Sequence, residues 1–267
     1  MIDVVVGHDG TARIVAGDRV LGVRRSGEEM PPHHAPRPSW HPLRTVDGAT
    51  FTEDGPADHP WHHGLSIAVA NVAVDGHRDA ATSWGGPTFQ DGAYRDLANA
   101  ARQRTRAMSA TGRVLTEEID WIGRDGRLLL TETRESRVAK TSDGWSLTIA
   151  PRWRAHRDLG FGSPTTAGRP DAGYGGLFLR GSDALLGAGV VLDGIDTPAD
   201  EAMGTTAYQC ALVRAATSIT MNADRPTPWF LRTDPVVMLC AAPFFHETME
   251  LAAGSQTSWS WGVEIRS

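Results

Sequence analysis

The chain has 267 residues, of which 40% are hydrophobic and 22% charged, a balance typical of a soluble globular protein and not of global disorder. Its net charge of -6 and its scattered basic residues argue against a nucleic-acid surface, because phosphate binding needs a concentrated excess of Lys and Arg. The longest apolar run, Pro235 to Phe245, is far shorter than the roughly 20 residues of a membrane helix, so we expect no membrane association.

Residues 1–6 lack the basic segment, apolar segment and cleavage site of a signal peptide, which predicts a cytoplasmic protein. Cys210 and Cys240 each lie in an apolar, strand-like segment, and we expect them to be buried thiols. Residues 1–267 are predicted to form one domain, because all-β folds of this size are often single units. The oligomeric state is not indicated by the sequence.

Short segments with strand chemistry recur between turn signals along the whole chain. The predicted strands are Thr11–Val15, Arg19–Arg24, Leu65–Val74, Val114–Ile122, Arg127–Val138, Trp145–Arg154, Gly176–Arg180, Gly189–Asp193, Ala207–Val213, Ser218–Met221, Trp229–Arg232, Val236–Ala241, Glu247–Leu251 and Gln256–Ile265. By contrast, only Tyr94–Arg106 has helix-forming composition, and Ser26–Pro38 is predicted to be irregular. Glu117 interrupts the apolar face of its predicted strand. The pattern predicts an antiparallel all-β fold, either a two-sheet β-sandwich or a supersandwich, with little helix.

Eight of the nine tryptophans fall into two groups. One group alternates with polar residues in predicted strands, and we expect its members to pack in the core: Trp121, Trp145, Trp153, Trp259 and Trp261. Another group lies in segments rich in Pro, Gly or His, where a core position is not expected: Trp40, Trp61 and Trp84. The sequence therefore predicts that this second group contributes to a site.

Six of the ten histidines cluster in one region that is rich in Pro, Gly and Trp: His33, His34, His41, His59, His62 and His63. This region is too polar and too interrupted by Pro to be core structure, so it predicts a site built from loops. Pro60 lies inside the run 58–63, and a regular helix carrying two zinc ligands is therefore not expected there. Because successive strand residues point to opposite faces, only one of His62 and His63 would face the site.

The order of several motifs resembles the bacterial PmoA-like family. These motifs are Arg37-Pro-x-x-His-Pro-Leu43, Thr52, Asp58-His-Pro-x-His-His-Gly-Leu65, Trp84-Gly-Gly-Pro87, Gly175-Gly-Leu-Phe-Leu-Arg180, and a last strand pair around Phe245-His246 and Gly254. The resemblance implies a β-supersandwich similar to galactose mutarotase-like proteins and a role in sugar catabolism. The label "methane oxygenase" that family members carry implies a histidine-metal oxygenase, although this chain has no apolar segment long enough for the transmembrane helices of membrane methane monooxygenase subunits.

The histidine region admits two chemistries. With a divalent metal, the ligands would be His41, His59 and His63, and Asp58 would be a further ligand or the carboxylate that orients an imidazole. Without a metal, these residues and His62 would act as acid and base on a sugar hydroxyl or ring carbon, because imidazole titrates near neutral pH. No cofactor is specified by the spacing of these residues, and both chemistries stay open.

Aromatic and basic side chains near these motifs suit a polar ring, because Trp offers a flat surface to C–H groups and Arg donates to hydroxyls or an acidic group. The candidate substrate-binding residues are Arg37, Trp40, Arg44, Trp61, Trp84 and Arg180, with His246 and Glu247 brought to the cleft by analogy with the fold. We therefore expect a carbohydrate isomerase or lyase/hydrolase whose partner is a small-molecule sugar or oxidised sugar. The alternatives are a non-catalytic sugar-binding or accessory protein and a histidine-metal oxygenase.

Overall fold

The computed structural model describes residues 2–7 and 9–266 and shows an antiparallel β structure of two large sheets that share a strand. In spatial order, the first sheet contains β1 (Ile2–Val6), β2 (Ala12–Ala16), β3 (Arg19–Arg25), β4 (Ser39–Leu43), β5 (Leu65–Val69), β15 (Gly175–Gly181), β20 (Val237–Ala241) and β19 (Thr217–Arg232).

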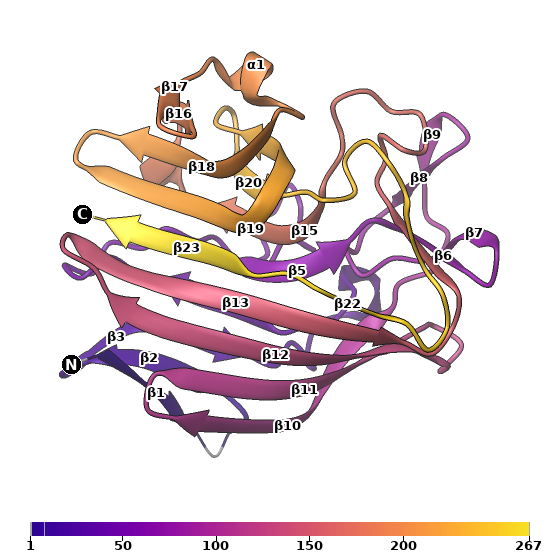
Figure 1. The fold of residues 1–267 in the computed structure, drawn as a ribbon, viewed down its shortest axis with the longest axis horizontal. Coiled ribbons are helices and arrows are strands. Elements are labelled where there is room, and N and C mark those ends of the chain that lie inside the picture. The colour runs from indigo at the N-terminus through magenta and orange to yellow at the C-terminus, as the bar shows by residue number, and fades with distance from the viewer. Residues whose placement is uncertain (1, 8, 267) are drawn as a thin grey trace.

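The second sheet continues from the shared strand β19 and includes the longest strands of the protein (Figure 1). In spatial order it contains β10 (Arg102–Thr111), β11 (Val114–Ile122), β12 (Leu128–Lys140), β13 (Gly144–Ala155), β23 (Trp261–Arg266), β19, β18 (Thr206–Arg214), β16 (Gly189–Leu192) and β17 (Ile195–Asp196), with β22 (Gln256–Ser258) also beside β13.

Smaller elements lie at one end of the molecule, on the right in Figure 1. A four-stranded sheet contains β21 (Met249–Leu251), β14 (Leu159–Gly162), β6 (Asn71–Val74) and β7 (His77–Ala81), and a hairpin contains β8 (Thr88–Gln90) and β9 (Ala93–Arg95). The helical segments of the described residues are short: α1 (Ala199–Ala202) and the 3-10 turns η1 (Pro32–His34) and η2 (Asp183–Leu185). None of the described helices is long and apolar enough to cross a membrane.

The predicted antiparallel all-β fold is confirmed, but the helix predicted over Tyr94–Arg106 is wrong. This segment contributes to β9 and β10 instead, and β10 pairs with β11 along its whole length. Arg104 and Arg106 of β10 both form ion pairs with Asp120 on β11. Long side chains with good helix propensity thus occupy a strand because cross-strand pairing outweighs their intrinsic preference.

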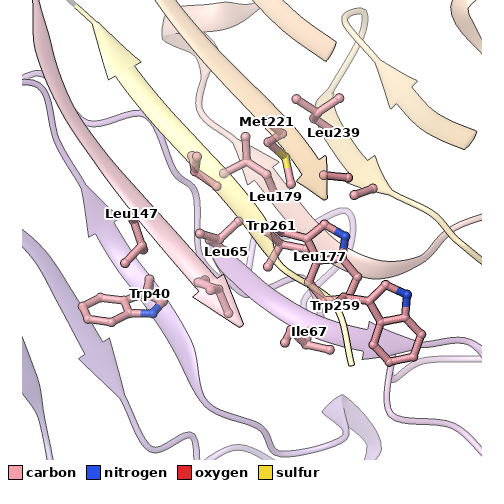
Figure 2. Packing of buried hydrophobic residues seen from close by; sticks show 14 of the residues in the cluster. Trp40, Leu65, Ile67, Leu147, Leu177, Leu179, Met221, Leu239, Trp259 and Trp261 are labelled. Atoms are coloured by element: carbon pink, nitrogen blue, oxygen red, sulfur yellow. The ribbon is translucent and has the colours of Figure 1, made fainter. Parts of the chain in front are cut away.

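The main hydrophobic core lies between the two large sheets, and it confirms the prediction for the five tryptophans of the strands (Figure 2). The Trp153 ring lies 4.9 Å from that of Trp121 and 4.7 Å from that of Trp259, measured between ring centres. Trp40 also belongs to this core, with 3% of its surface exposed. Its predicted role as a surface for sugar stacking is therefore wrong, because β4 turns the ring inward.

Strands β5, β15 and β20 are buried on both faces, which explains their continuous apolar sequences. Leu177 and Leu179 face the main core, whereas Phe178 between them belongs to a second apolar cluster on the opposite face. This second cluster consists of Ala68, Ala70, Trp84, Phe178, Phe230, Met238, Cys240, Ala242 and Phe245. Cys240 and Cys210 are free, buried thiols, as predicted. The histidine-rich loops lie next to this second cluster.

Candidate functional site

A cavity of about 370 Å³ borders the second apolar cluster. Phe230 of β19 and Met238 of β20 contribute to its apolar lining. Its remaining walls come from loops, from β9 and from the end of β19, and they include His59, Trp61, His62, Trp84, Pro87, Tyr94, Arg169, Asp171, Ala172, Tyr174 and Arg232. We call this space the aromatic cavity. It brings together four of the residues that the sequence predicts: His59, Trp61, His62 and Trp84.

The glycine pair after Trp84 allows Trp61 to pack directly on the main chain. Gly85 and Gly86 have φ values of +90° and +67°, and a Cβ atom added to Gly86 would lie 2.4 Å from Cε2 of Trp61. Only glycine meets both requirements without strain. The Trp84 ring in turn lies 4.4 Å from the Tyr174 ring, so the motif builds one aromatic wall of the cavity.

Asp58 and His59 form a hydrogen-bonded pair beside the cavity. The Nδ1 of His59 donates to Oδ2 of Asp58 over 2.8 Å, and Arg180 donates to both oxygens of Asp58 over 3.1 to 3.3 Å. Arg180 also donates to Glu53 over 2.9 Å, so its charge is already matched by carboxylates. Although burial raises the pKa of Asp58, the hydrogen bonds from His59 and Arg180 lower it to about 2. Asp58 is therefore ionised and holds His59 in one orientation.

His62 lies in an aromatic setting between the loop and β15. Its ring stacks on that of His59 with 4.7 Å between centres and meets Phe178 edge-on at 4.9 Å. Burial, together with the nearby His59 and Arg180, lowers the pKa of His62 to about 2. Its Nδ1 atom is buried and has no hydrogen-bond partner among the described residues. His62 is thus uncharged at neutral pH.

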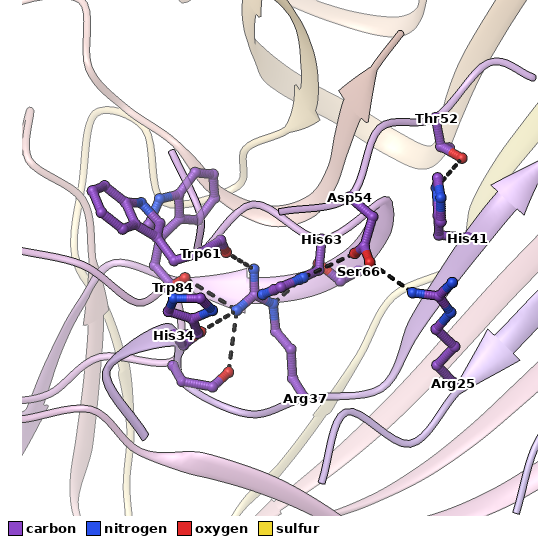
Figure 3. A network of polar contacts seen from close by, with 11 residues as sticks. Arg25, His34, Arg37, His41, Thr52, Asp54, Trp61, His63, Ser66 and Trp84 are labelled. Atoms are coloured by element: carbon purple, nitrogen blue, oxygen red, sulfur yellow. Dashed lines mark hydrogen bonds and ion pairs between the residues drawn. The ribbon is translucent and has the colours of Figure 1, made fainter. Parts of the chain in front are cut away.

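His63 has different neighbours from His62, and Figure 3 shows it beside Asp54. Its Nδ1 donates to Oδ1 of Asp54 over 2.9 Å, and Asp54 also accepts from Arg25 over 2.7 Å. His41 lies close by and is hydrogen bonded through Nδ1 to the Thr52 hydroxyl at 2.9 Å. We call Arg25, His41, Thr52, Asp54 and His63 the Asp54 cluster. Burial lowers the pKa values of both histidines.

Asp54 is a polar residue of this region that the sequence does not single out, and His34 belongs to the histidine cluster of the sequence but has no predicted role in the site. In the sequence, Asp54 precedes Gly55 and has the pattern of an ordinary turn residue. Its contact with His63 becomes visible only in the structure, where the two residues form an isolated β-bridge. The His34 ring lies 5.5 Å from that of His63, and Nδ1 of His34 and Nε2 of His63 are both buried without a partner among the described residues. Burial, with His33 and His63 nearby, lowers the pKa of His34 to about 4.

Arg37 is fully buried and ties several loops together (Figure 3). Its guanidinium donates to the Ser66 hydroxyl over 3.1 Å and to four main-chain carbonyls, those of His34, Ala35, Trp61 and Trp84, over 2.9 to 3.1 Å. Burial lowers its pKa to about 9, which leaves it charged at neutral pH. Arg37 therefore does not reach the cavity as a substrate ligand, which corrects the prediction, and it stabilises the loops that form the cavity.

Three further predicted residues lie away from the aromatic cavity. Arg44, after β4, donates to the carbonyl of Val20 over 3.4 Å. His246 is exposed and its Nε2 donates to the carbonyl of Gly204 over 2.9 Å, while Glu247 is also exposed. His246 and Glu247, in the turn after β20, do not line the aromatic cavity.

The structure gives the three predicted metal ligands separate partners. Nδ1 of His41 is bonded to Thr52, that of His59 to Asp58, and that of His63 to Asp54. Within residues 2–7 and 9–266, no group of three or more His, Cys, Asp or Glu side chains has the arrangement needed to hold a metal ion. In the described part of the chain, His41, His59 and His63 are therefore not brought together as a set of metal ligands.

The structure is similar to several solved structures at low sequence identity. They include heparan sulfate lyase HepC from Pedobacter heparinus (8% identity, TM-score 0.43, 98% of this chain and 34% of that chain). Others are a galactose mutarotase-like protein from Lactobacillus casei (10%, 0.42, 100% of both chains) and 4-alpha-glucanotransferase from Thermococcus litoralis (11%, 0.41, 100% and 41%). This chain thus spans about a third of the length of the lyase. At these identities and TM-scores, the likenesses carry no information on activity.

Residues 11–267 match the model of a protein family described as "Family of unknown function (DUF6807)". No curated protein matches the chain. The family description assigns no activity, and it does not repeat the PmoA-like label that the motifs suggest.

Proposed function

This chain belongs to the DUF6807 family of unknown function, and we propose that it is a carbohydrate-processing enzyme, an isomerase or lyase/hydrolase that acts on a sugar or oxidised sugar. The observation that carries the proposal is the Asp58–His59 pair at the wall of the aromatic cavity. A cavity of about 370 Å³ suits a small molecule, since ligand sites measure about 300–1,000 Å³.

The lining of the cavity supports a sugar as the ligand. Trp61 and Trp84 line the cavity, and aromatic faces pack well against the C–H groups of a pyranose ring. Tyr94 and Tyr174 add hydroxyl groups, which lie 2.9 Å from each other. A ligand with an apolar face and many hydroxyls matches this combination.

His59 is the proposed general base. Its Nδ1–H is held by Asp58, so Nε2 carries the lone pair that takes a proton from a sugar hydroxyl or from a carbon beside a carbonyl. Asp58, kept ionised by Arg180, stabilises the imidazolium that forms. Because the pKa of His62 is lowered, His62 stays neutral and lines the cavity as a hydrogen-bonding side chain, not as a charged acid.

We assign His41 and His63 a positioning role, because the cavity lining does not include them. Their bonds to Thr52 and Asp54 join β4 and the loop that leads to β5. We do not carry the histidine-metal oxygenase forward, because His41, His59 and His63 do not form a group that could hold a metal ion in the described part of the chain. The second candidate is a non-catalytic protein that binds a sugar in the same cavity. The hydrogen bonds of Asp58 to both His59 and Arg180 favour it, because they give Asp58 a structural role that needs no catalysis.

The test measures binding and turnover separately on the full chain. Neutral, oxidised and keto sugars are incubated with the protein and followed by NMR, while calorimetry gives their affinities. We expect His59→Ala to lower turnover by about 100-fold or more, the usual contribution of a general base, with little change in affinity. His77→Ala is the matched control, because His77 lies on β7, is exposed and does not line the cavity.

Each outcome has a distinct meaning. Turnover that survives in His59→Ala would remove His59 from the mechanism. Binding without turnover in the unmodified protein would replace the enzyme by the sugar-binding alternative. If no sugar binds or reacts, the carbohydrate proposal as a whole is overturned.

A further inference from the structure

Two arginines line the aromatic cavity without a carboxylate partner. Arg169 and Arg232 both belong to the lining, and neither forms an ion pair with a carboxylate in the described part of the chain. Arg169 is half-buried and Arg232 is exposed, and two fully buried arginines near the site, Arg37 and Arg180, differ from them. Arg180 forms ion pairs with Asp58 and Glu53. The Arg37 guanidinium donates its hydrogen bonds to main-chain carbonyls and a hydroxyl.

Aromatic rings and hydrogen bonds hold both free guanidinium groups in place. Arg169 Cζ lies 4.8 Å from the centre of the Tyr94 ring, and NH1 of Arg169 donates to the Tyr94 hydroxyl. Arg232 Cζ lies 5.6 Å from the centre of the Phe230 ring, two residues earlier on β19. Stacking on a ring leaves the edge of a guanidinium free to donate in its own plane.

The charge of this wall is opposite to that of the whole chain. Asp171 is the one carboxylate in the lining, so Arg169 and Arg232 leave a local excess of one positive charge, while the chain carries a net charge of -6. A partly enclosed cavity focuses such a field and favours an anionic ligand. Arg pairs with carboxylates through two parallel hydrogen bonds, which a neutral hydroxyl cannot match.

Resting on the proposed function, we propose that the substrate is an acidic sugar, a uronic acid, whose carboxylate binds Arg169 and Arg232 while its ring lies between Trp61, Trp84 and His59. This arrangement leaves the carboxylate at the β19 side of the cavity and a ring carbon or hydroxyl near the base. It also moves the anion-binding role from Arg37, Arg44 and Arg180, which the sequence favours, to two arginines that it does not single out.

The experiment compares matched pairs of sugars, glucuronate with glucose and galacturonate with galactose, by calorimetry on the full chain. We expect Arg169→Gln and Arg232→Gln each to weaken uronate binding at least tenfold, about 1.4 kcal/mol, with less than a twofold effect on neutral sugars. The matched control is Arg95→Gln, because Arg95 is exposed on β9 beside Tyr94, donates to the Gln90 carbonyl and does not line the cavity. Added salt should weaken uronate binding only.

The possible results separate the two proposals. Equal affinity for uronates and neutral sugars, or uronate binding that survives both substitutions, overturns the acidic-sugar inference and leaves the proposed function standing. Binding or turnover of neutral sugars without uronates likewise overturns the acidic-sugar inference and leaves the proposed function standing. If the unmodified protein binds neither class, the proposed function fails and the inference fails with it. A thermal unfolding curve of each variant shows that its fold is retained.

Discussion

At the scale of single residues, adjacent side chains of the loop site have different roles. His62 stacks on His59 and faces the aromatic cavity, whereas His63 bonds to Asp54 on the other side of the chain. The environment of each ring, and not the residue type, decides its protonation. His59, with Nδ1 on an ionised Asp58, is the one of these three imidazoles that combines access to the cavity with an orienting carboxylate.

Gly86→Ala tests whether contact between Trp61 and the main chain shapes the cavity. A methyl group there would meet the Trp61 ring and would also strain a backbone with φ of +67°. We expect a loss of stability of about 1–3 kcal/mol, together with weaker ligand binding because Trp61 must move. Urea denaturation and calorimetry measure the two effects.

Gly92→Ala is the matched control for Gly86→Ala. Gly92 also has positive φ, +79°, but a Cβ atom there would have no neighbour within 4 Å. This variant therefore reports the backbone strain alone, and it should leave ligand binding unchanged. Equal losses of stability and binding in both variants would show that the Trp61 contact has no special importance.

At the scale of elements, the strands of the second sheet contain a buried network of charges. Glu132 of β12 accepts from Nε of Arg134 over 2.6 Å and from Nε1 of Trp121 over 2.8 Å. Glu117, which interrupts the apolar face of β11, forms an ion pair with Arg24 of β3. The network thus links strands of both large sheets and gives the irregularity in the sequence pattern of β11 a structural reason.

Glu132→Gln removes the negative charge from this network and leaves Arg134 without its ion-pair partner. We expect a loss of about 3–5 kcal/mol in the free energy of unfolding, because a buried cation then lacks compensation. Glu135→Gln on the same strand is the control, since Glu135 and its partner Arg137 are 3.9 Å apart and more than half exposed. We expect Glu135→Gln to lower the free energy of unfolding by less than about 1 kcal/mol. Similar midpoints of chemical denaturation for the two variants would contradict this difference.

At the scale of the whole molecule, the two sheets form one core. Ile2 near the start and Ile265 near the end belong to the same apolar cluster, and β19 is hydrogen bonded in both sheets. We therefore propose that residues 1–267 unfold as one domain, in a single transition. Two separate transitions in a calorimetric scan would contradict this proposal.

Stability should fall as the pH is lowered from 7 to 5. In the unfolded chain His62 takes up a proton near pH 6.5, whereas the buried ring stays neutral until about pH 2, so acid favours the unfolded state. One such group contributes up to about 1.4 kcal/mol per pH unit. His34, with its pKa of about 4, acts in the same direction. Asp58 does not contribute in this window, because its stabilisation is lost only as the pH falls from 3.8 towards 2.

His62→Gln should flatten this pH dependence, measured by urea denaturation at pH 7, 6 and 5. The control is His77→Gln, which replaces an exposed histidine and should retain the slope of the unmodified protein. An unchanged slope in His62→Gln would mean that the buried ring does not set the acid sensitivity.

Local patterns in the sequence are sufficient to determine the all-β class, the five buried tryptophans, the two buried thiols and the non-helical loop at Pro60. Each of these depends on neighbouring residues, through alternation, burial of apolar side chains or the missing N–H of proline. The aromatic character of the site, with Trp61 and Trp84 close together, also follows motifs that are visible in the sequence.

The tertiary structure alone decides the partners of the polar residues. Asp54 meets His63 across a bridge, Arg37 ends among loop carbonyls, and Arg169 and Arg232 come to one cavity from a loop and from β19. The strand at β10 likewise depends on its neighbour β11. Charges and hydrogen bonds act over a few ångströms in space, and residues separated by many positions in the chain reach those distances only after the sheets have closed around the core.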